Sequence, residues 1–437
     1  MFNPLISGPI SANFITFSGS RASCIAQDGT VYTATSYNIA PYYGAIQLWK
    51  STDNGQTYQA ISNSSSGTSA GSATATANNI NITAAPDGKI HCFWVDSVAT
   101  VVIRYKVYNP FSNTWSTSNG SIDGGSMTRL RGAVIDTNGG IHVVININES
   151  GGDFTSWRLR HLYKSSETLE NWTLTPSLPP IYNTTSGITA LSNGQIAVFS
   201  VFNGLAVIKM WTSGVWSSDF QVDNQVMADI VSITSNNLGQ VELLYRRSET
   251  LQNTYTRIWD GSSLSAALVV QRGETDGSKA LSDGHLYTDL NTNDTYIVYK
   301  GQYQEIWMNK KPYGGVWGTP IQMHPGYIYS SKVSIPTNGF APYLPVFISD
   351  IYQQYVFYDR IFVHNKIPYR TLKVNTTKGI LNIPVYPPDV SLLANKQLRI
   401  KIDNTFEYGL IETGLITDAK ASPLRIRTNQ GTRALLK

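Results

Sequence analysis

Charged side chains and cysteines are scarce in this chain. Of its 437 residues, 14% are Asp, Glu, Lys or Arg, and two, Cys24 and Cys92, are cysteines. Two cysteines do not make a disulfide framework, so we expect both to be small buried residues of strands. There is also no run of about 18 apolar residues, the length that a membrane-spanning helix needs. We therefore expect no membrane insertion.

Sequence signals for export, metals and cofactors are missing as well. The stretch from Met1 to Leu5 lacks the basic and long apolar regions of a signal peptide, so we expect none. The six histidines are scattered, without a clustered His/Cys set for zinc. There is no calcium loop of the EF-hand type and no phosphate-cradling glycine motif. The sequence therefore predicts neither a metal nor a cofactor.

The net charge of +4 is unevenly placed. From Phe362 onward there are 12 lysines and arginines against five acids, a net charge of +7, while the rest of the chain carries −3. The basic residues alternate with apolar ones and do not form the dense charge run of a nucleic-acid-binding tail. We expect no nucleic-acid partner.

Aromatic and turn-forming residues are abundant, with 25 Tyr, 10 Trp and 35 Gly. An apolar strand, a tight turn and a second apolar strand first occur together in Cys24 to Tyr32, around Asp28-Gly29. The pattern recurs around Asp87-Gly88, Gly139-Gly140, Asn193-Gly194, Leu238-Gly239, Asn293-Asp294 and Asn338-Gly339. A repeat of about 50 residues is typical of propeller blades.

A second hairpin with an aromatic-rich strand follows each tight turn, as in Gln47 to Trp49 and Lys209 to Trp211. An aromatic residue comes after its turn at Tyr58, Trp115, Trp172, Trp216 and Trp317. Four strands per unit predict an all-β fold, a β-propeller with seven blades favoured. Six blades stay possible if one unit is a false count. The strand-like run Phe14 to Phe17 is expected to complete the last blade and close the ring.

The repeat stops near Asn365. Beyond it, strands are predicted at Leu372–Val374, Ile380–Val385, Leu398–Ile402 and Leu424–Arg427, whose residues alternate as in a half-exposed sheet. We therefore divide the chain into a β-propeller, residues 1–364, and a small C-terminal β domain, residues 365–437.

The clearest single motif is Ser51-Thr52-Asp53-Asn54-Gly55-Gln56-Thr57-Tyr58. Ser51 and Asp53 can accept hydrogen bonds from the backbone of their own turn, Gly55 tolerates positive φ, and Tyr58 re-enters the core. The stretch resembles the Asp box, or BNR repeat, of sialidase-like β-propellers. That resemblance implies a propeller in which these residues are structural. It does not imply sialidase activity, since Asp boxes also occur in other propellers.

The first unit is also similar to the start of sialidases. Arg21 matches the position of the family's carboxylate-binding arginine, and Arg131 occupies the same place in its own unit. The two arginines are expected either to hold an anionic group near the axis or to contact carbonyls and acids of adjacent blades. Sialidases place an acid between the first hairpin and the first Asp box, but no Asp or Glu lies between Gly29 and Asp53. We expect no catalytic residues.

The long connections are expected on the propeller face opposite the tight turns, where binding commonly occurs. They are Ser36 to Tyr43, Ser62 to Asn79, Thr117 to Arg129, Asn148 to Trp157, Arg246 to Asn253 and Gln271 to Gly284. Candidate ligand-binding residues on them are Tyr37, Tyr42, Tyr43, Trp157, Arg246 and Arg247. The aromatic rings suit sugar faces and protein interfaces. The two arginines are either an anion contact or a solvated pair.

The last strand and the tail from Gly431 to Lys437 are similar to short C-terminal modules of bacteriophage tail and virion proteins. Together with the missing sialidase acid and the missing signal peptide, this resemblance leads us to expect a non-enzymatic virion protein, made in the host cytoplasm. Its propeller would bind a host-surface glycan or receptor, and its C-terminal domain would bind other virion proteins; a homo-oligomer is possible. Two alternatives stay open: a glycan-degrading hydrolase on the same propeller, and a purely structural decoration or collar protein.

Overall fold

The computed structural model describes most of the propeller and the strands of the C-terminal part. The described residues are 3–6, 21–37, 45–63, 77–97, 101–116, 120–123, 128–148, 157–167, 172–175, 178, 185–202, 204–224, 226–247, 253–270, 282–301, 305–324, 332–340, 342–350, 355–362, 370–376, 379–385, 397–402, 405–410, 425–428 and 431–434. The chain divides into two compact units, Met1–Val363 and His364–Lys437. Across these ranges the regular structure is β-strand, without a helix, so the all-β expectation is confirmed.

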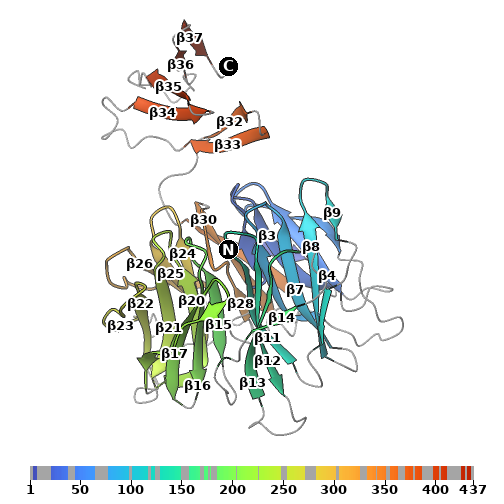
Figure 1. The fold of residues 1–437 in the computed structure, drawn as a ribbon, viewed down its shortest axis with the longest axis vertical. Helices are drawn as coiled ribbons and strands as arrows, with labels where there is room; N and C mark the ends of the chain where they lie inside the picture. Colours follow the sequence, from blue (N-terminus) through green and yellow to red (C-terminus); the bar gives the residue numbers. More distant parts are fainter. Residues whose placement is uncertain are drawn as a thin grey trace. The chain divides into compact units, whose positions relative to one another are not determined.

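The first unit is a ring of seven sheets, the blades of a β-propeller (Figure 1). Blade 1 contains β2 (Ser23–Ile25), β3 (Val31–Tyr37), β4 (Ala45–Ser51) and β5 (Gln59–Asn63). Blade 2 contains β6 (Ala77–Ala84), β7 (Ile90–Ser97), β8 (Val101–Asn109), β9 (Thr114–Trp115) and β10 (Gly120–Asp123). Blade 3 contains β11 (Thr128–Ile135), β12 (Ile141–Asn148), β13 (Trp157–Lys164) and β14 (Thr173–Leu174).

The remaining four blades follow the same order, from the axis outward. Blade 4 contains β15 (Ser186–Ala190), β16 (Ile196–Phe202), β17 (Leu205–Thr212), β18 (Val215–Trp216) and β19 (Phe220–Asp223). Blade 5 contains β20 (Val226–Ser235), β21 (Val241–Arg247), β22 (Thr254–Trp259) and β23 (Leu268–Val269). Blade 6 contains β24 (Ser282–Asp289), β25 (Thr295–Lys300), β26 (Ile306–Lys311) and β27 (Ile321–His324). Blade 7 contains β28 (Lys332–Ser334), β30 (Tyr343–Asp350), β31 (Tyr355–Phe362) and β1 (Asn3–Ile6). Seven blades are confirmed.

The first strand of the chain closes the ring. β1 pairs antiparallel with β31, with Asn3 opposite Tyr358 and Ile6 opposite Val356. The last blade therefore joins the two ends of the propeller sequence, and β31 is covered by β1 instead of being the edge of its sheet. An early segment of the chain closes the ring, as expected, and that segment is β1; the run Phe14–Phe17 named for this role lies outside the described residues.

Blade 7 departs from the repeat at its first turn. A tight hairpin was expected at Asn338–Gly339, but these residues form β29 (Asn338–Gly339), which pairs parallel with β24 of blade 6. A Cβ atom at Gly339 would lie 2.7 Å from Cδ1 of Ile25 in blade 1, so only glycine fits there. One short segment of blade 7 thus packs against both of its neighbouring blades.

The other six first turns are tight because their own side chains satisfy the backbone. In blade 3, Asp136 Oδ1 accepts hydrogen bonds from the N–H groups of Asn138 and Gly140, both at 2.8 Å. Adjacent turns are also linked, because Asn237 of blade 5 donates from Nδ2 to the carbonyl oxygen of Leu290 in blade 6 at 2.7 Å. Similar hydrogen bonds link the first turns of blades 4 and 5 and connect that of blade 6 to Phe340 of blade 7.

Strand order defines two faces of the ring. We call the face with the first and third connections of each blade the turn face, and the face with the second connections and blade crossings the loop face. One segment expected to be an irregular connection, Thr117 to Arg129, contains β10, which pairs with β8, and the start of β11. That expectation is corrected: part of this segment widens the blade 2 sheet.

The turn from Ser51 to Tyr58 on the turn face is held by two side chains. Asp53 Oδ1 accepts hydrogen bonds from the N–H groups of Gln56 and Thr57, both at 3.0 Å, and Ser51 Oγ accepts one from the N–H of Gly55 at 2.8 Å. Gly55 has a φ of 78°. Ser51 and Asp53 thus accept backbone hydrogen bonds within the turn and Gly55 adopts a positive φ, as the sequence predicts.

Aromatic residues after the third turns pack on the preceding blade. Tyr58 of blade 1 makes an edge contact with Phe347 of blade 7, with ring centroids 5.3 Å apart. Trp216 of blade 4 donates from Nε1 to Thr175 Oγ1 of blade 3 at 3.1 Å. Trp317 of blade 6 makes the same contact with Thr256 Oγ1 of blade 5, at 2.8 Å. These rings fill the wedge between adjacent blades and hold them in sequence.

The apolar core lies between the blades. Each buried cluster draws on adjacent blades, for example Ile46 and Cys92 in one cluster, or Phe199 and Leu243 in another. Near the axis the blades approach so closely that side chains must be absent. A Cβ atom at Gly187 would lie 2.7 Å from Cγ2 of Ile233 in the next blade. Such contacts set the distance between adjacent blades near the axis.

The described residues of the second unit form three two-stranded hairpins. They pair β32 (Arg370–Thr376) with β33 (Gly379–Val385), β34 (Gln397–Ile402) with β35 (Thr405–Leu410), and β36 (Arg425–Thr428) with β37 (Gly431–Ala434). The four strands expected from the sequence lie in β32, β33, β34 and β36.

Replacing Gly187 tests the close approach of blades at the axis. We expect Gly187→Val to lower the free energy of unfolding by about 1–3 kcal/mol, because the new side chain overlaps Ile233. Denaturant unfolding followed by Trp fluorescence reports on the propeller alone, since all 10 tryptophans precede residue 363. The control Ser218→Ala, at an exposed site, should change the free energy of unfolding by less than about 0.5 kcal/mol. Equal stability of the two variants would contradict the packing described.

Replacing Asp53 tests the hydrogen-bonded turn. Asp53→Ala leaves two backbone N–H groups without their acceptor, and we expect it to lower the free energy of unfolding by about 1–2 kcal/mol. The neighbouring exposed change Thr52→Ala is the control and should have little effect. If both variants unfold at the same denaturant concentration as the parent chain, the turn does not depend on Asp53.

Candidate functional site

One cation spans the axis of the ring. Arg21, which directly precedes β2 of blade 1, is 6% exposed. Its Nη2 donates to Ser232 Oγ of blade 5 at 2.8 Å and to the carbonyl oxygen of Leu286 in blade 6 at 3.0 Å. Its Nη1 donates to the carbonyl oxygen of Ile335 in blade 7 at 3.3 Å. Contact with carbonyls of other blades is the structural alternative that the sequence had left open for Arg21.

The charge of Arg21 is buried without an acid beside it. Burial lowers the pKa of Arg21 to about 9, so the guanidinium group is still protonated at neutral pH. Its hydrogen-bond acceptors are two carbonyls and a hydroxyl, and no carboxylate of the described residues pairs with it. Three N–H groups are engaged, and a guanidinium has five.

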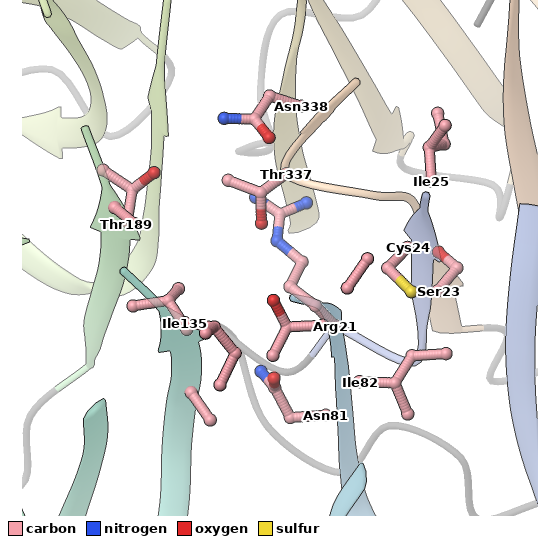
Figure 2. A pocket seen from close by; sticks show the side chains of 15 residues that line it. Arg21, Ser23, Cys24, Ile25, Asn81, Ile82, Ile135, Thr189, Thr337 and Asn338 are labelled. Atoms are coloured by element: carbon pink, nitrogen blue, oxygen red, sulfur yellow. The ribbon is translucent and has the colours of Figure 1, made fainter. Parts of the chain in front are cut away.

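A cavity of about 120 Å³ lies beside Arg21 (Figure 2). It is lined by Arg21, Ser23, Cys24, Ile25, Asn81, Ile82, Thr83, Ala84, Ala133, Val134, Ile135, Thr189, Ala190, Thr337 and Asn338. Most of these residues end the inner strands and lead into the first turns, so the cavity lies on the turn-face side of Arg21. A hollow of about 10 Å³, lined by Gly132, Gly187 and Ser232 among others, adjoins Arg21 further along the same strands. We call the larger space the axial cavity.

Arg131 does not join Arg21 in the axial cavity. It is the extra residue at a bulge of β11, between Leu130 and Gly132, and is 3% exposed. Burial, and then the neighbouring Arg129, lower the pKa of Arg131 to about 9. Arg131 lines neither of the two axial spaces. The expected pairing of the two arginines around one group at the axis is therefore not seen there.

Arg246 and Arg247 lie in a strand. They end β21, where an exposed loop was expected, because the strand extends further than its turn signals suggest. Arg246 is buried, and Arg247 donates from Nε to Asp223 Oδ2 of blade 4 at 2.8 Å, where the hydroxyl of Tyr245 also donates at 3.1 Å. The interpretation of Arg246 and Arg247 as a solvated pair is wrong, since Arg246 is buried and Arg247 of blade 5 binds Asp223 of blade 4.

Two of the aromatic candidates, Tyr37 and Trp157, lie at strand ends on the loop face. Tyr37 ends β3 and Trp157 begins β13, opposite Asn148, so both backbones reach that face. Tyr42 and Tyr43 lie outside the described residues, in the connection from β3 to β4. Their roles in ligand binding stay predictions.

A buried row of polar side chains runs outward through blade 3. Asp136 Oδ2 lies 3.2 Å from His142 Nε2, His142 Nδ1 lies 3.0 Å from His161 Nε2, and His161 Nδ1 lies 3.1 Å from Thr175 Oγ1. Burial, and then the neighbouring His142, lower the pKa of His161 to about 3. The row is enclosed by Trp211 and Trp216, which makes it a structural element of the blade.

Two further expectations concern thiols and metals. Cys24 and Cys92 are buried and free, as expected. In the described ranges, no three His, Cys, Asp or Glu side chains are grouped so as to hold a metal ion. The same ranges contain no helix with the length and apolarity to cross a membrane.

Sequence reasoning missed the residues around Arg21. Asn81, Gly132, Gly187 and Ser232 each lie opposite the fourth residue of the second strand of their blade. A small or polar residue therefore interrupts four successive apolar strands at one repeat position. Aligning the units by their turns would have revealed this signal, which marks the side chains nearest the axis.

Comparisons with known proteins leave the family open. No family model matches the chain, and no curated protein resembles it. A chain from a crystal structure of a mitotic checkpoint complex is 9% identical, with a TM-score of 0.51, over 82% of this chain and 98% of that one. A Hadza microbial sialidase is 12% identical, with a TM-score of 0.46, over 64% of this chain; the match spans 63% of the sialidase's own length. Aleuria aurantia lectin, in complex with α-methyl-L-fucoside, is 15% identical, with a TM-score of 0.44, over 70% of this chain and 95% of the lectin. At 9% identity, the match to the checkpoint-complex chain shows a common fold and no more.

The buried histidines predict a loss of stability in acid. The pKa of His161 is about 3 in the folded chain, and burial lowers the pKa of His91 to about 4, while unfolded histidine titrates near 6.5. The unfolded state therefore binds protons first, and stability present above pH 6.5 falls progressively as the pH drops toward 3. We expect His161→Gln to flatten the dependence of unfolding free energy on pH between 6 and 4, and His91→Gln to do so independently. An unchanged slope in both variants would contradict their burial in the neutral form.

Proposed function

We propose that this chain is a non-enzymatic protein of a bacteriophage particle. Its loop face would bind a host-surface glycan or another receptor. Its C-terminal unit, residues 365–437, would attach it to other virion proteins. The observation that carries the proposal is the contrast between the two faces of a closed, rigid ring.

The turn face is built for structure. Its turns are satisfied by their own side chains, as at Asp53 and Asp136, and hydrogen bonds link the first turns of blades 4, 5 and 6 to one another. Two long connections, the 13 residues between β5 and β6 and the 12 between β23 and β24, are blade crossings and belong to the loop face. Long connections on a rigid scaffold tolerate change without loss of fold, which makes them suited to recognition.

The centre of the ring gives little support to the hydrolase alternative. Glycoside hydrolysis by the common mechanisms needs two facing carboxyl groups. The residues that line the axial cavity include no Asp or Glu. At about 120 Å³ the cavity is also smaller than the roughly 300–1,000 Å³ of small-molecule pockets. A receptor ligand would therefore be held by the loop-face connections around the mouth, with the axis closed behind them by Arg21.

Attachment through the C-terminal unit rests on its sequence. It holds the basic excess of +7, and the stretch that is similar to C-terminal modules of virion proteins begins in its last hairpin. The last propeller strand, β31, ends on the turn face. The loop face is thus the one remote from the point where the chain leaves the ring.

Binding of the purified full-length chain to intact bacterial cells and to a glycan array tests the proposal, with product release assayed on every hit. We expect binding without turnover. The double change Tyr42→Ala/Tyr43→Ala should weaken it by about tenfold or more, because aromatic anchors dominate such interfaces. Phe111→Ser, at a turn-face tip where Phe111 is 84% exposed, is the matched control and should bind as the parent does.

The other outcomes separate the alternatives. Release of sugar from a bound glycan would contradict the non-enzymatic proposal and favour the hydrolase. Binding that is lost with Phe111→Ser and kept with Tyr42→Ala/Tyr43→Ala would place recognition on the turn face. The absence of binding to any cell or glycan would favour a purely structural virion protein.

A further inference from the structure

The axial cavity carries an inference that is independent of what the loop face binds. It is lined by a single ionised side chain, Arg21, with Ser23, Asn81, Thr83, Thr189 and Asn338 as its main polar groups. The lining contains no Asp or Glu. The acids of the nearby first turns are used locally: Asp28 and Asp136 accept hydrogen bonds from backbone N–H groups of their own turns.

Two of these polar side chains are buried without a partner in the described structure. Ser23 is 1% exposed and Asn81 is 2% exposed, and neither Ser23 Oγ nor Asn81 Oδ1 makes a hydrogen bond. A buried polar group left unsatisfied costs about 1–3 kcal/mol. Both side chains line the same cavity as Arg21 (Figure 2). The amide of Asn81 can turn either its oxygen or its N–H₂ group into that space, since the two ends are similar in shape.

Three side chains of this lining can each turn a donor toward the cavity. The Ser23 hydroxyl can donate, the Asn81 amide can donate after a flip, and two guanidinium N–H groups of Arg21 are not engaged by its three hydrogen bonds. Water would satisfy Ser23 and Asn81 but would leave the buried cation without a counter-charge. An anion satisfies the donors and compensates the charge together, which is the arrangement that buried charges usually require.

We propose that the axial cavity is a binding site for one small monovalent anion of halide size, held by Arg21, Ser23 and Asn81. Its size of about 120 Å³ accommodates a few water-sized groups and excludes a sugar ring. The anion is a permanent counter-ion of Arg21 and stabilises the junction of blade 1 with blades 5, 6 and 7. This site lies on the turn-face side of the axis and does not require the receptor proposal to hold.

Bromide locates the site directly in the unaltered protein. Crystals of the full-length chain grown with sodium bromide should show an anomalous scattering peak in the axial cavity, within hydrogen-bond distance of Arg21 and of Ser23 or Asn81. In solution, chloride or bromide should raise the Tm by about 1–2 °C over gluconate at equal ionic strength, because the anion binds the folded state only. Gluconate is too large for the cavity.

Variants link the two measurements. Ser23→Ala removes one donor with little change of shape and should reduce the chloride-dependent rise in Tm. The control Ser217→Ala, at an exposed position directly after β18 of blade 4, should leave that rise unchanged. Arg21→Met, if it folds, should abolish the rise. Bromide only at surface sites, a peak for water only, or a bromide peak without any anion-specific rise in Tm would each overturn the proposal. A rise in Tm that Ser23→Ala and Arg21→Met both leave intact would do so as well.

Discussion

A buried cation at the centre of the ring is the interaction on which the rest of the propeller depends. Seven inner strands converge on the axis, and the guanidinium group of Arg21 links the first blade to blades 5, 6 and 7. Taking a charge out of water is unfavourable unless hydrogen bonds replace its hydration. Carbonyl oxygens at the edges of the inner strands supply that replacement only when the blades are in place, so ring assembly and charge burial stabilise each other.

Closure at the rim complements this contact at the axis. β1 completes blade 7, and the segment with β29 joins blade 7 to blade 6 and to Ile25 of blade 1. Between them lie the aromatic side chains that follow the third turns and pack on the preceding blade. The core is therefore a series of similar joints between neighbours. A rigid ring of this kind can carry long connections on one face without losing its shape.

Local patterns were enough to predict the blades. The repeat could be predicted because its signals depend on neighbours in sequence: turn residues such as Asp28-Gly29, aromatics such as Trp216, and the Ser51–Tyr58 turn. The closing strand could not be predicted, because a four-residue strand beginning at Asn3 has no signal apart from its partner β31. Likewise, the acceptors of Arg21 lie 211 to 314 residues away, and the end of β21 at Arg247 is fixed by Asp223 in another blade.

Recognition by the loop face is the central claim about function, and it can be tested without knowing the ligand. Hydrogen–deuterium exchange of the full-length chain, with and without host-type bacterial envelope fragments, reports which face becomes protected. Protection of peptides covering 36–46 and 148–158, with none in 51–58 or 109–115, is the predicted result. Protection confined to the turn-face peptides would contradict the claim.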